Sequence, residues 1–134
     1  MNEIFRVEGT GYQVWTARSH KLSVNVVTDP SQAGTRRYYI VGELPEIKFE
    51  TEISRMSDCW KIFLTDQPGR QTELYLDLID CVEKVCVGSS VFRISKSEHA
   101  LTLSVRVRLG ADSMKEICSV EIYTLHNEVI ITVL

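Results

Sequence analysis

Apolar and polar residues alternate along most of this chain, and the clearest example is the stretch 100–109, which reads Ala-Leu-Thr-Leu-Ser-Val-Arg-Val-Arg-Leu. Successive side chains of a β-strand point to opposite faces, so the leucines and valines of this stretch share one face. Arg106 and Arg108 share the opposite face with Thr102 and Ser104. The pattern predicts a strand with one buried face and one face in water.

The same period of two recurs along the chain, with turn residues such as Asp66-Gln67-Pro68-Gly69 between the segments. It predicts strands at 4–8, 12–17, 21–28, 37–44, 47–53, 59–65, 72–79, 100–109, 117–125 and 129–134, and one more inside 85–94, after Gly88. Roughly ten short strands at this spacing are typical of a β-sandwich. We therefore expect a single domain over residues 1–134, with the fold of an all-β, antiparallel β-sandwich.

Two segments also allow a helical interpretation. Residues 74–86 place apolar side chains at helical spacing, but their β-branched and aromatic residues favour a strand followed by a loop. Residues 110–115 leave room for one helical turn.

The last segment, 129–134, reads Val-Ile-Ile-Thr-Val-Leu and carries no charge. An exposed strand of this kind would promote aggregation, so it must be covered or paired. Two arrangements satisfy that requirement: the strand is central in its own sheet, or a partner completes it.

A series of features between Leu22 and Ile94 has a recognisable order. An alternating strand, 22–26, precedes an aromatic-rich strand, 38–41, and the tetrapeptide Lys48-Phe49-Glu50-Thr51. Trp60 then begins an apolar alternating strand. The next segment, residues 74–80, reads Leu-Tyr-Leu-Asp-Leu-Ile-Asp. Finally, the dipeptide Val87-Gly88 precedes the apolar segment 91–94. This order resembles that of a C2 domain, which implies a β-sandwich of about eight strands. The small sandwich of the p23-like chaperone-binding domains is the nearest alternative.

The calcium site of such domains is not matched here. Calcium requires several converging oxygen ligands, and the C2 domains that bind it supply aspartates from two loops. The matching loops hold only Asp29 and Asp80, while Arg36 and Arg37 stand where the family has an aspartate and Val82 occupies a second such position. The resemblance therefore implies a calcium-independent domain, and we expect no metal site and no cofactor.

The lysine-rich strand through which some C2 domains bind lipid is not matched either. The corresponding strand carries Glu46, Lys48, Glu50 and Glu52, and this excess of acid would repel anionic headgroups. A membrane-binding role remains the alternative to a protein-binding role.

Composition and the N-terminal sequence also bear on the binding partners and the cellular location. The chain has 15 basic and 18 acidic residues, a formal net charge of −3, and so no general attraction for nucleic acid. The N-terminus lacks the features of a signal peptide and no apolar stretch approaches the ~18 residues of a membrane span. We expect a cytoplasmic or otherwise intracellular protein whose four cysteines are reduced, the rival being a secreted domain with two disulfides.

Candidate catalytic chemistry is sparse. The histidines, His20, His99 and His126, all fall in predicted loops, and no serine or cysteine has the local setting of a nucleophile. The cysteines lack the paired spacing of a zinc site. We expect no catalytic residues and no enzymatic activity.

Arginines are the strongest candidates for partner binding: Arg36, Arg37, Arg106 and Arg108. Two guanidinium groups on one sheet face can bind carboxylates or phosphates in a bidentate manner, although cross-strand pairing with glutamate is the alternative. Trp15, Tyr12, Tyr38 and Tyr39 suggest a stacking surface, or core and interface roles in an acidic chain. The sequence thus predicts a non-catalytic protein-interaction module, a scaffold or assembly domain, with a phospholipid-binding C2 domain and a p23-like co-chaperone as alternatives.

Overall fold

The structure is a computed structural model that describes residues 2–28, 35–55, 59–66, 71–77, 81–87, 90–96, 99–111 and 113–134. This part of the chain contains β-strands and no helix, and all strand pairs are antiparallel. The strands form two sheets, so the predicted all-β, antiparallel fold class is confirmed. The described strands number twelve, more than the eight that the resemblance implied.

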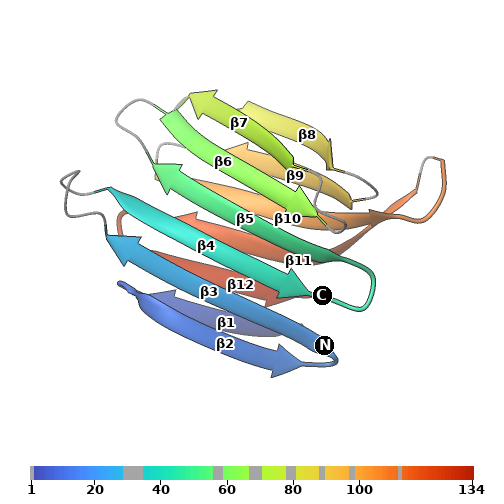
Figure 1. Cartoon of the computed structure of the whole chain (residues 1–134), viewed down its shortest axis with the longest axis horizontal. Helices are drawn as coiled ribbons and strands as arrows, with labels where there is room; N and C mark the ends of the chain where they lie inside the picture. Colours follow the sequence, from blue (N-terminus) through green and yellow to red (C-terminus); the bar gives the residue numbers. More distant parts are fainter. Residues whose placement is uncertain are drawn as a thin grey trace. The chain divides into compact units, whose positions relative to one another are not determined.

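The strands of the first sheet are β1 (Glu3–Glu8), β12 (Glu128–Val133), β11 (Met114–Tyr123), β10 (Ala100–Arg108), β9 (Ser90–Lys96) and β8 (Cys81–Val87), in that order (Figure 1). The strands of the second are β2 (Gly11–Ala17), β3 (His20–Thr28), β4 (Arg36–Glu43), β5 (Lys48–Arg55), β6 (Cys59–Asp66) and β7 (Gln71–Asp77). Except at β1, neighbours in a sheet are also neighbours in the sequence. Each sheet is therefore built mainly from successive hairpins.

The chain divides into two compact units that correspond to these sheets. Unit 1 comprises Met1–Glu8 and Ile79–Leu134, and unit 2 comprises Gly9–Leu78. The expectation of a single domain over the whole chain stays a prediction.

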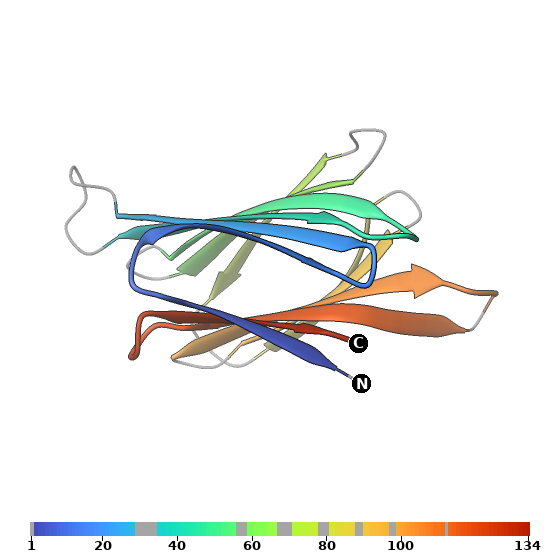
Figure 2. The same ribbon diagram turned by 90° about the horizontal axis from the view of Figure 1, so that it is seen from below.

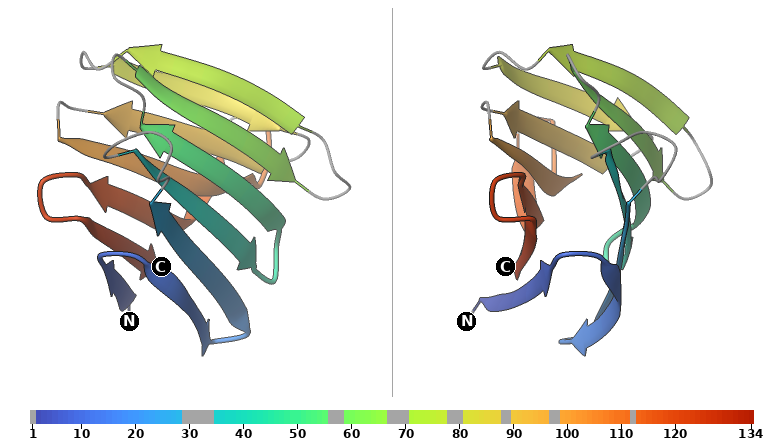
Figure 3. Two further views of the ribbon diagram at one scale, coloured as in Figure 1. Left: turned by 60° about the vertical axis from the view of Figure 1, so that its left-hand side comes forward. Right: turned by 90° about the vertical axis from the view of Figure 1, so that its left-hand side faces the viewer.

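Unit 2 is a six-stranded meander from β2 to β7, seen most openly in the left view of Figure 3. In β3 to β6 most alternate residues are apolar and buried, as the sequence pattern predicts: Leu22, Val24, Val26, Tyr38, Ile40, Phe49, Ile53, Trp60, Ile62 and Leu64. The turn between β2 and β3 holds Arg18 and Ser19, both with positive φ, as expected for a two-residue hairpin loop of type I′. His20 supports this turn, since its Nδ1 lies 2.7 Å from the carbonyl oxygen of Arg18.

Unit 1 places the apolar C-terminal strand inside its sheet. β12 pairs with β1 on one side and with β11 on the other, so both of its edges are occupied within the chain. Val129, Ile131 and Val133 are buried. Of the two arrangements that the sequence allowed, the central position is confirmed and completion by a partner strand is wrong.

The hairpin of β10 and β11, drawn in orange at the right of Figure 2, has a shift of register that marks a β-bulge. Val105 pairs with Cys118 but Arg106 pairs with Glu116, so Ile117 is the extra residue. Because of this irregularity the consecutive residues Ile117 and Cys118 are both buried, which strict alternation does not permit.

Several sequence predictions need correction in unit 1. Residues 81–87 were expected to form a loop but are strand β8, because antiparallel pairing with β9 satisfies their backbone groups. The described residues of 110–115 form no helical turn, since β11 begins at Met114 and the amides of Leu109 and Gly110 donate to the carbonyl of Ser113. Asp29, Asp80 and most of the turn at 66–69 lie outside the described residues.

Candidate functional site

The solvent-facing side of the unit 2 sheet gathers side chains from all six strands, and we call it the open face. Antiparallel register aligns its residues in rows that cross the sheet. The first row runs Tyr12, Asn25, Tyr39, Glu52, Phe63, Glu73; the second runs Val27, Arg37, Ser54, Lys61, Tyr75; the third runs Val14, Ser23, Val41, Glu50, Thr65, Gln71. In the first row, aromatic residues alternate with polar ones.

Apolar groups on the open face are unusually exposed. Tyr12 and Tyr75 are 65% and 61% exposed, and Val14 and Val27 are 42% and 39% exposed. Tyr39, Val41 and Phe63 lie between them and are half-buried. Single exposed apolar residues are normal on a protein surface, but here several share one face of one sheet, which makes this face the candidate site.

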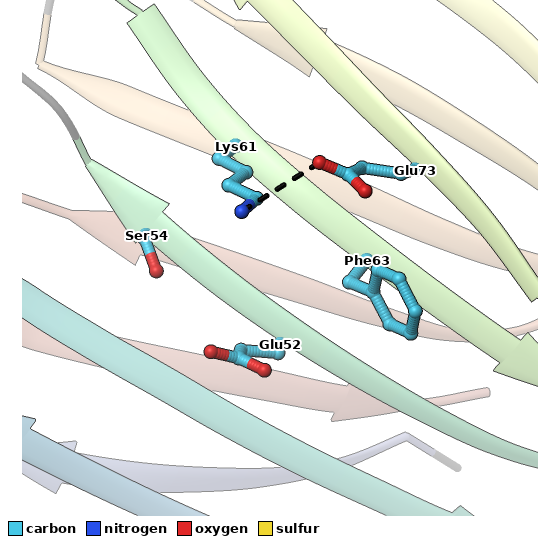
Figure 4. A pocket seen from close by; sticks show the side chains of 5 residues that line it. All are labelled: Glu52, Ser54, Lys61, Phe63 and Glu73. Atoms are coloured by element: carbon cyan, nitrogen blue, oxygen red, sulfur yellow. Dashed lines mark ion pairs between the residues drawn. The ribbon is translucent and has the colours of Figure 1, made fainter.

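A hollow of about 220 Å³ lies on this face over β5, β6 and β7 (Figure 4). Its lining residues are Glu52, Ser54, Lys61, Phe63 and Glu73. The lining is thus a mixture of two carboxylates, one ammonium group, one hydroxyl and one aromatic ring. Strand register accounts for it, because Glu52 pairs with Phe63, Ser54 with Lys61, and Phe63 with Glu73.

Glu73 interacts with two neighbouring side chains, Lys61 and Tyr75. The Nζ of Lys61 lies 3.6 Å from its Oε1, and the hydroxyl of Tyr75 donates a hydrogen bond to the same oxygen. The ammonium of Lys61 also lies 5.8 Å from the centroid of the Tyr75 ring. The hydrogen bond from Tyr75, aided by the charge of Lys61, lowers the pKa of Glu73, so this carboxylate is ionised at neutral pH.

The same interactions change the other two pKa values. Tyr75 and Glu73 raise the pKa of Lys61, and the bond to Glu73 raises the pKa of Tyr75. Lys61 therefore keeps its charge and Tyr75 keeps its proton at neutral pH.

Arg36 and Arg37, predicted for partner binding, lie at the start of β4 but on opposite sides of the sheet. Arg37 belongs to the open face, opposite Val27 and Ser54. Arg36 alternates to the side of buried Tyr38. Burial raises the pKa of Tyr38, and the charge of Arg36 opposes that rise.

Arg106 and Arg108 lie on β10 in unit 1, whereas Arg36 and Arg37 lie on β4 in unit 2. Arg108 is exposed, but Arg106 is half-buried and its Nε is buried without a hydrogen bond in the described part of the chain. Register places Arg106 between Glu116 on β11 and Val91 on β9. The predicted alternation of β10 is confirmed, and within its less buried face Arg106 is only partly exposed while Arg108 is exposed.

Sequence reasoning singled out Tyr12 and Tyr39 but grouped them with Tyr38, which is buried. It missed Phe63, Tyr75 and the whole hollow. Alternation within β4 is a sequence signal that would have placed Tyr38 and Tyr39 on opposite faces of the sheet. In contrast, only the register between strands shows that Phe63 lies beside Glu52.

The described residues also bear on metal binding, thiol chemistry and membrane-spanning helices. They contain no group of three or more histidine, cysteine, aspartate or glutamate side chains arranged for a metal ion. Cys118 is a free, buried thiol. In the ranges that the structure describes, no helix has the length and apolar character needed to cross a membrane.

Comparison of the chain with protein family models, with curated proteins and with solved structures finds no match in any of the three.

Proposed function

We propose that this chain is a non-catalytic, calcium-independent protein-interaction module, and that it contacts its protein partner through the open face. The observation that carries the proposal is the set of exposed apolar side chains, Tyr12, Val14, Val27 and Tyr75, on one side of one sheet. Aromatic residues are enriched in protein interfaces, where they supply large contact areas at low entropic cost.

The charges of the open face favour a protein over nucleic acid or an acidic membrane. A fourth row of the open face runs Thr16, Lys21, Glu43, Lys48. With this row included, the bases of the open face, Lys21, Arg37, Lys48 and Lys61, are matched in number by its acids, Glu43, Glu50, Glu52 and Glu73. Lys48 Nζ lies 3.8 Å from Glu43 Oε1, so part of this charge is already balanced. A balanced surface does not attract a polyanion.

The C2-like part of the proposal rests on the sequence features between Leu22 and Ile94. The two antiparallel sheets of the described residues are compatible with such a fold. The roles of scaffold or assembly domain and an intracellular setting belong to the same proposal. A phospholipid-binding domain is the alternative.

The proposal is tested with the triple variant Tyr12→Ser/Val14→Ser/Val27→Ser, which is used to capture a partner from native lysate. These residues are exposed, so the triple variant should fold with a free energy of unfolding within about 1.5 kcal/mol of wild type, at ~0.5 kcal/mol per site. We expect it to lose the partner that the wild-type chain captures. Leu125→Ser is the matched control, because Leu125 is 66% exposed but lies in unit 1.

Equal capture by the triple variant and the wild type would refute the open face as the contact surface. Sedimentation with vesicles containing anionic lipid, with and without Ca²⁺, separates the membrane alternative. Wild-type protein that pellets with these vesicles while the triple variant does not would assign the open face to lipid.

A further inference from the structure

We infer that the hollow on the open face receives a guanidinium group, the head of an arginine side chain of the protein partner. This inference rests on the proposed function and specifies the chemistry that the partner must present. The charges, the neighbours and the size of the hollow lead to it.

Charge is the first argument. The hollow carries two carboxylates and one ammonium group, and Lys61 is already paired with Glu73 at 3.6 Å. Glu52 is half-buried and makes no hydrogen bond or ion pair in the part of the chain that the structure describes. A partly desolvated carboxylate gains from a cationic partner, and an anionic guest would meet a lining with a net negative charge.

The neighbours of Glu52 are the second argument. Its cross-strand partners on the open face are Tyr39 on β4 and Phe63 on β6, so the carboxylate stands between two aromatic residues. Figure 4 shows the Phe63 ring and the Glu52 carboxylate on the same side of the sheet, with the Lys61–Glu73 ion pair drawn above them. A cation bound to Glu52 can therefore also contact an aromatic ring, which adds a cation–π attraction.

Size and shape select the kind of cation. A volume of about 220 Å³ is smaller than the ~300–1,000 Å³ typical of small-molecule pockets, but it accommodates the end of a side chain. A planar guanidinium can bind a carboxylate through two parallel hydrogen bonds and stack on a ring, whereas an ammonium is a compact point charge. Arginine therefore fits the hollow better than lysine.

Titration of ¹⁵N-labelled full-length protein with N-acetyl-arginine amide, followed by two-dimensional NMR, tests the inference directly. We expect concentration-dependent shifts of the amides around Glu52, Ser54 and Phe63, smaller shifts with N-acetyl-lysine amide, and none with N-acetyl-glutamine amide. Glu52→Gln removes the charge at nearly constant shape and should abolish these shifts. Glu50→Gln should retain them, since Glu50 lies on the same face of β5 but outside the hollow.

Shifts that persist in Glu52→Gln, or that glutamine amide produces equally, would overturn the inference. Phe63→Leu is a second variant that keeps the carboxylate and should weaken arginine binding without abolishing it. The two-dimensional spectrum of each variant also shows whether it is folded.

Partner capture separates this inference from the function on which it rests. If Tyr12→Ser/Val14→Ser/Val27→Ser loses the partner and Glu52→Gln weakens capture by about tenfold or more, both stand. If the triple variant loses the partner but Glu52→Gln captures it like wild type, the guanidinium site is wrong and the open face stands. If the triple variant captures normally, the proposed function fails, whatever arginine amide does in the titration.

Discussion

Gly42 lies opposite Phe49 in the pairing of β4 with β5, and the two residues share the buried side of the sheet. A Cβ at position 42 would lie 2.2 Å from Cε1 of the Phe49 ring, which no real contact permits. The ring therefore occupies the space that a side chain at position 42 would need. The fully buried position of the Phe49 ring thus depends on having glycine at position 42.

We predict that Gly42→Ala lowers the free energy of unfolding by about 1–3 kcal/mol, the usual cost of overpacking a core. Chemical denaturation measures this loss. Phe49→Leu makes room at the site, so Gly42→Ala should cost clearly less in a Phe49→Leu background. Equal costs in the two backgrounds would show that the ring is not the obstacle.

Cys118 is a second residue whose properties depend on burial. Its side chain is fully buried on β11, and burial, aided by the charge of Glu116, raises the pKa of its thiol from 9.0 to about 12. The folded state therefore keeps this proton in a pH range where the unfolded chain releases it. Below about pH 9 the associated stability is fully present, and it is lost as the pH rises toward 12.

We predict that the free energy of unfolding falls between about pH 9 and 12, and that Cys118→Ala makes this fall shallower. Urea titrations at several pH values measure both slopes. Tyr38 contributes in the same direction at high pH, because burial also raises its pKa. An unchanged slope in Cys118→Ala would contradict the assignment to this thiol.

At the scale of elements, strand β12 is held from both sides, by β1 and β11. Ile131 lies on its buried side, while Ile130 alternates to the other side and is only half-buried. The two neighbouring isoleucines thus provide a matched pair within one strand.

We predict that Ile131→Ala lowers the free energy of unfolding by about 2–5 kcal/mol and Ile130→Ala by about 1 kcal/mol. Thermal or chemical denaturation of both variants gives the comparison. Removal of residues 129–134 should unfold unit 1, because the sheet loses an interior strand. A truncated chain that melts like the intact protein would show that β12 is dispensable.

The strands were predictable to different degrees. Alternation alone located β3 and β10 within about a residue of their ends, since one face of each is continuously apolar. β8 was expected to be a loop, because residues 81–87 do not show by themselves that they pair with β9. The turn at Arg18-Ser19 lacks the usual Asn-Gly signal, so its positive φ values were not foreseeable.

At the scale of the whole molecule, the described residues offer no clustered metal ligands, and the matched loop positions hold Arg36 and Arg37. We predict that millimolar Ca²⁺ leaves the melting temperature unchanged, because a ligand that binds only the native state would raise it. Differential scanning fluorimetry with CaCl₂, against MgCl₂ at equal ionic strength, is the measurement. A rise specific to Ca²⁺ would refute calcium independence and direct attention to Asp29 and Asp80.

Alternation of apolar and polar residues is enough to predict antiparallel strands with one apolar face each, because alternation is a local property of each segment. The sequence also identified single residues such as Tyr39 and Arg37, but not what lies beside them. Only the folded chain shows that β12 is interior, that Arg106 is half-buried, and that Glu52 lies between Tyr39 and Phe63. The physical reason is that neighbours across a sheet are set by pairing between segments distant in the sequence, and burial is set by what those neighbours cover.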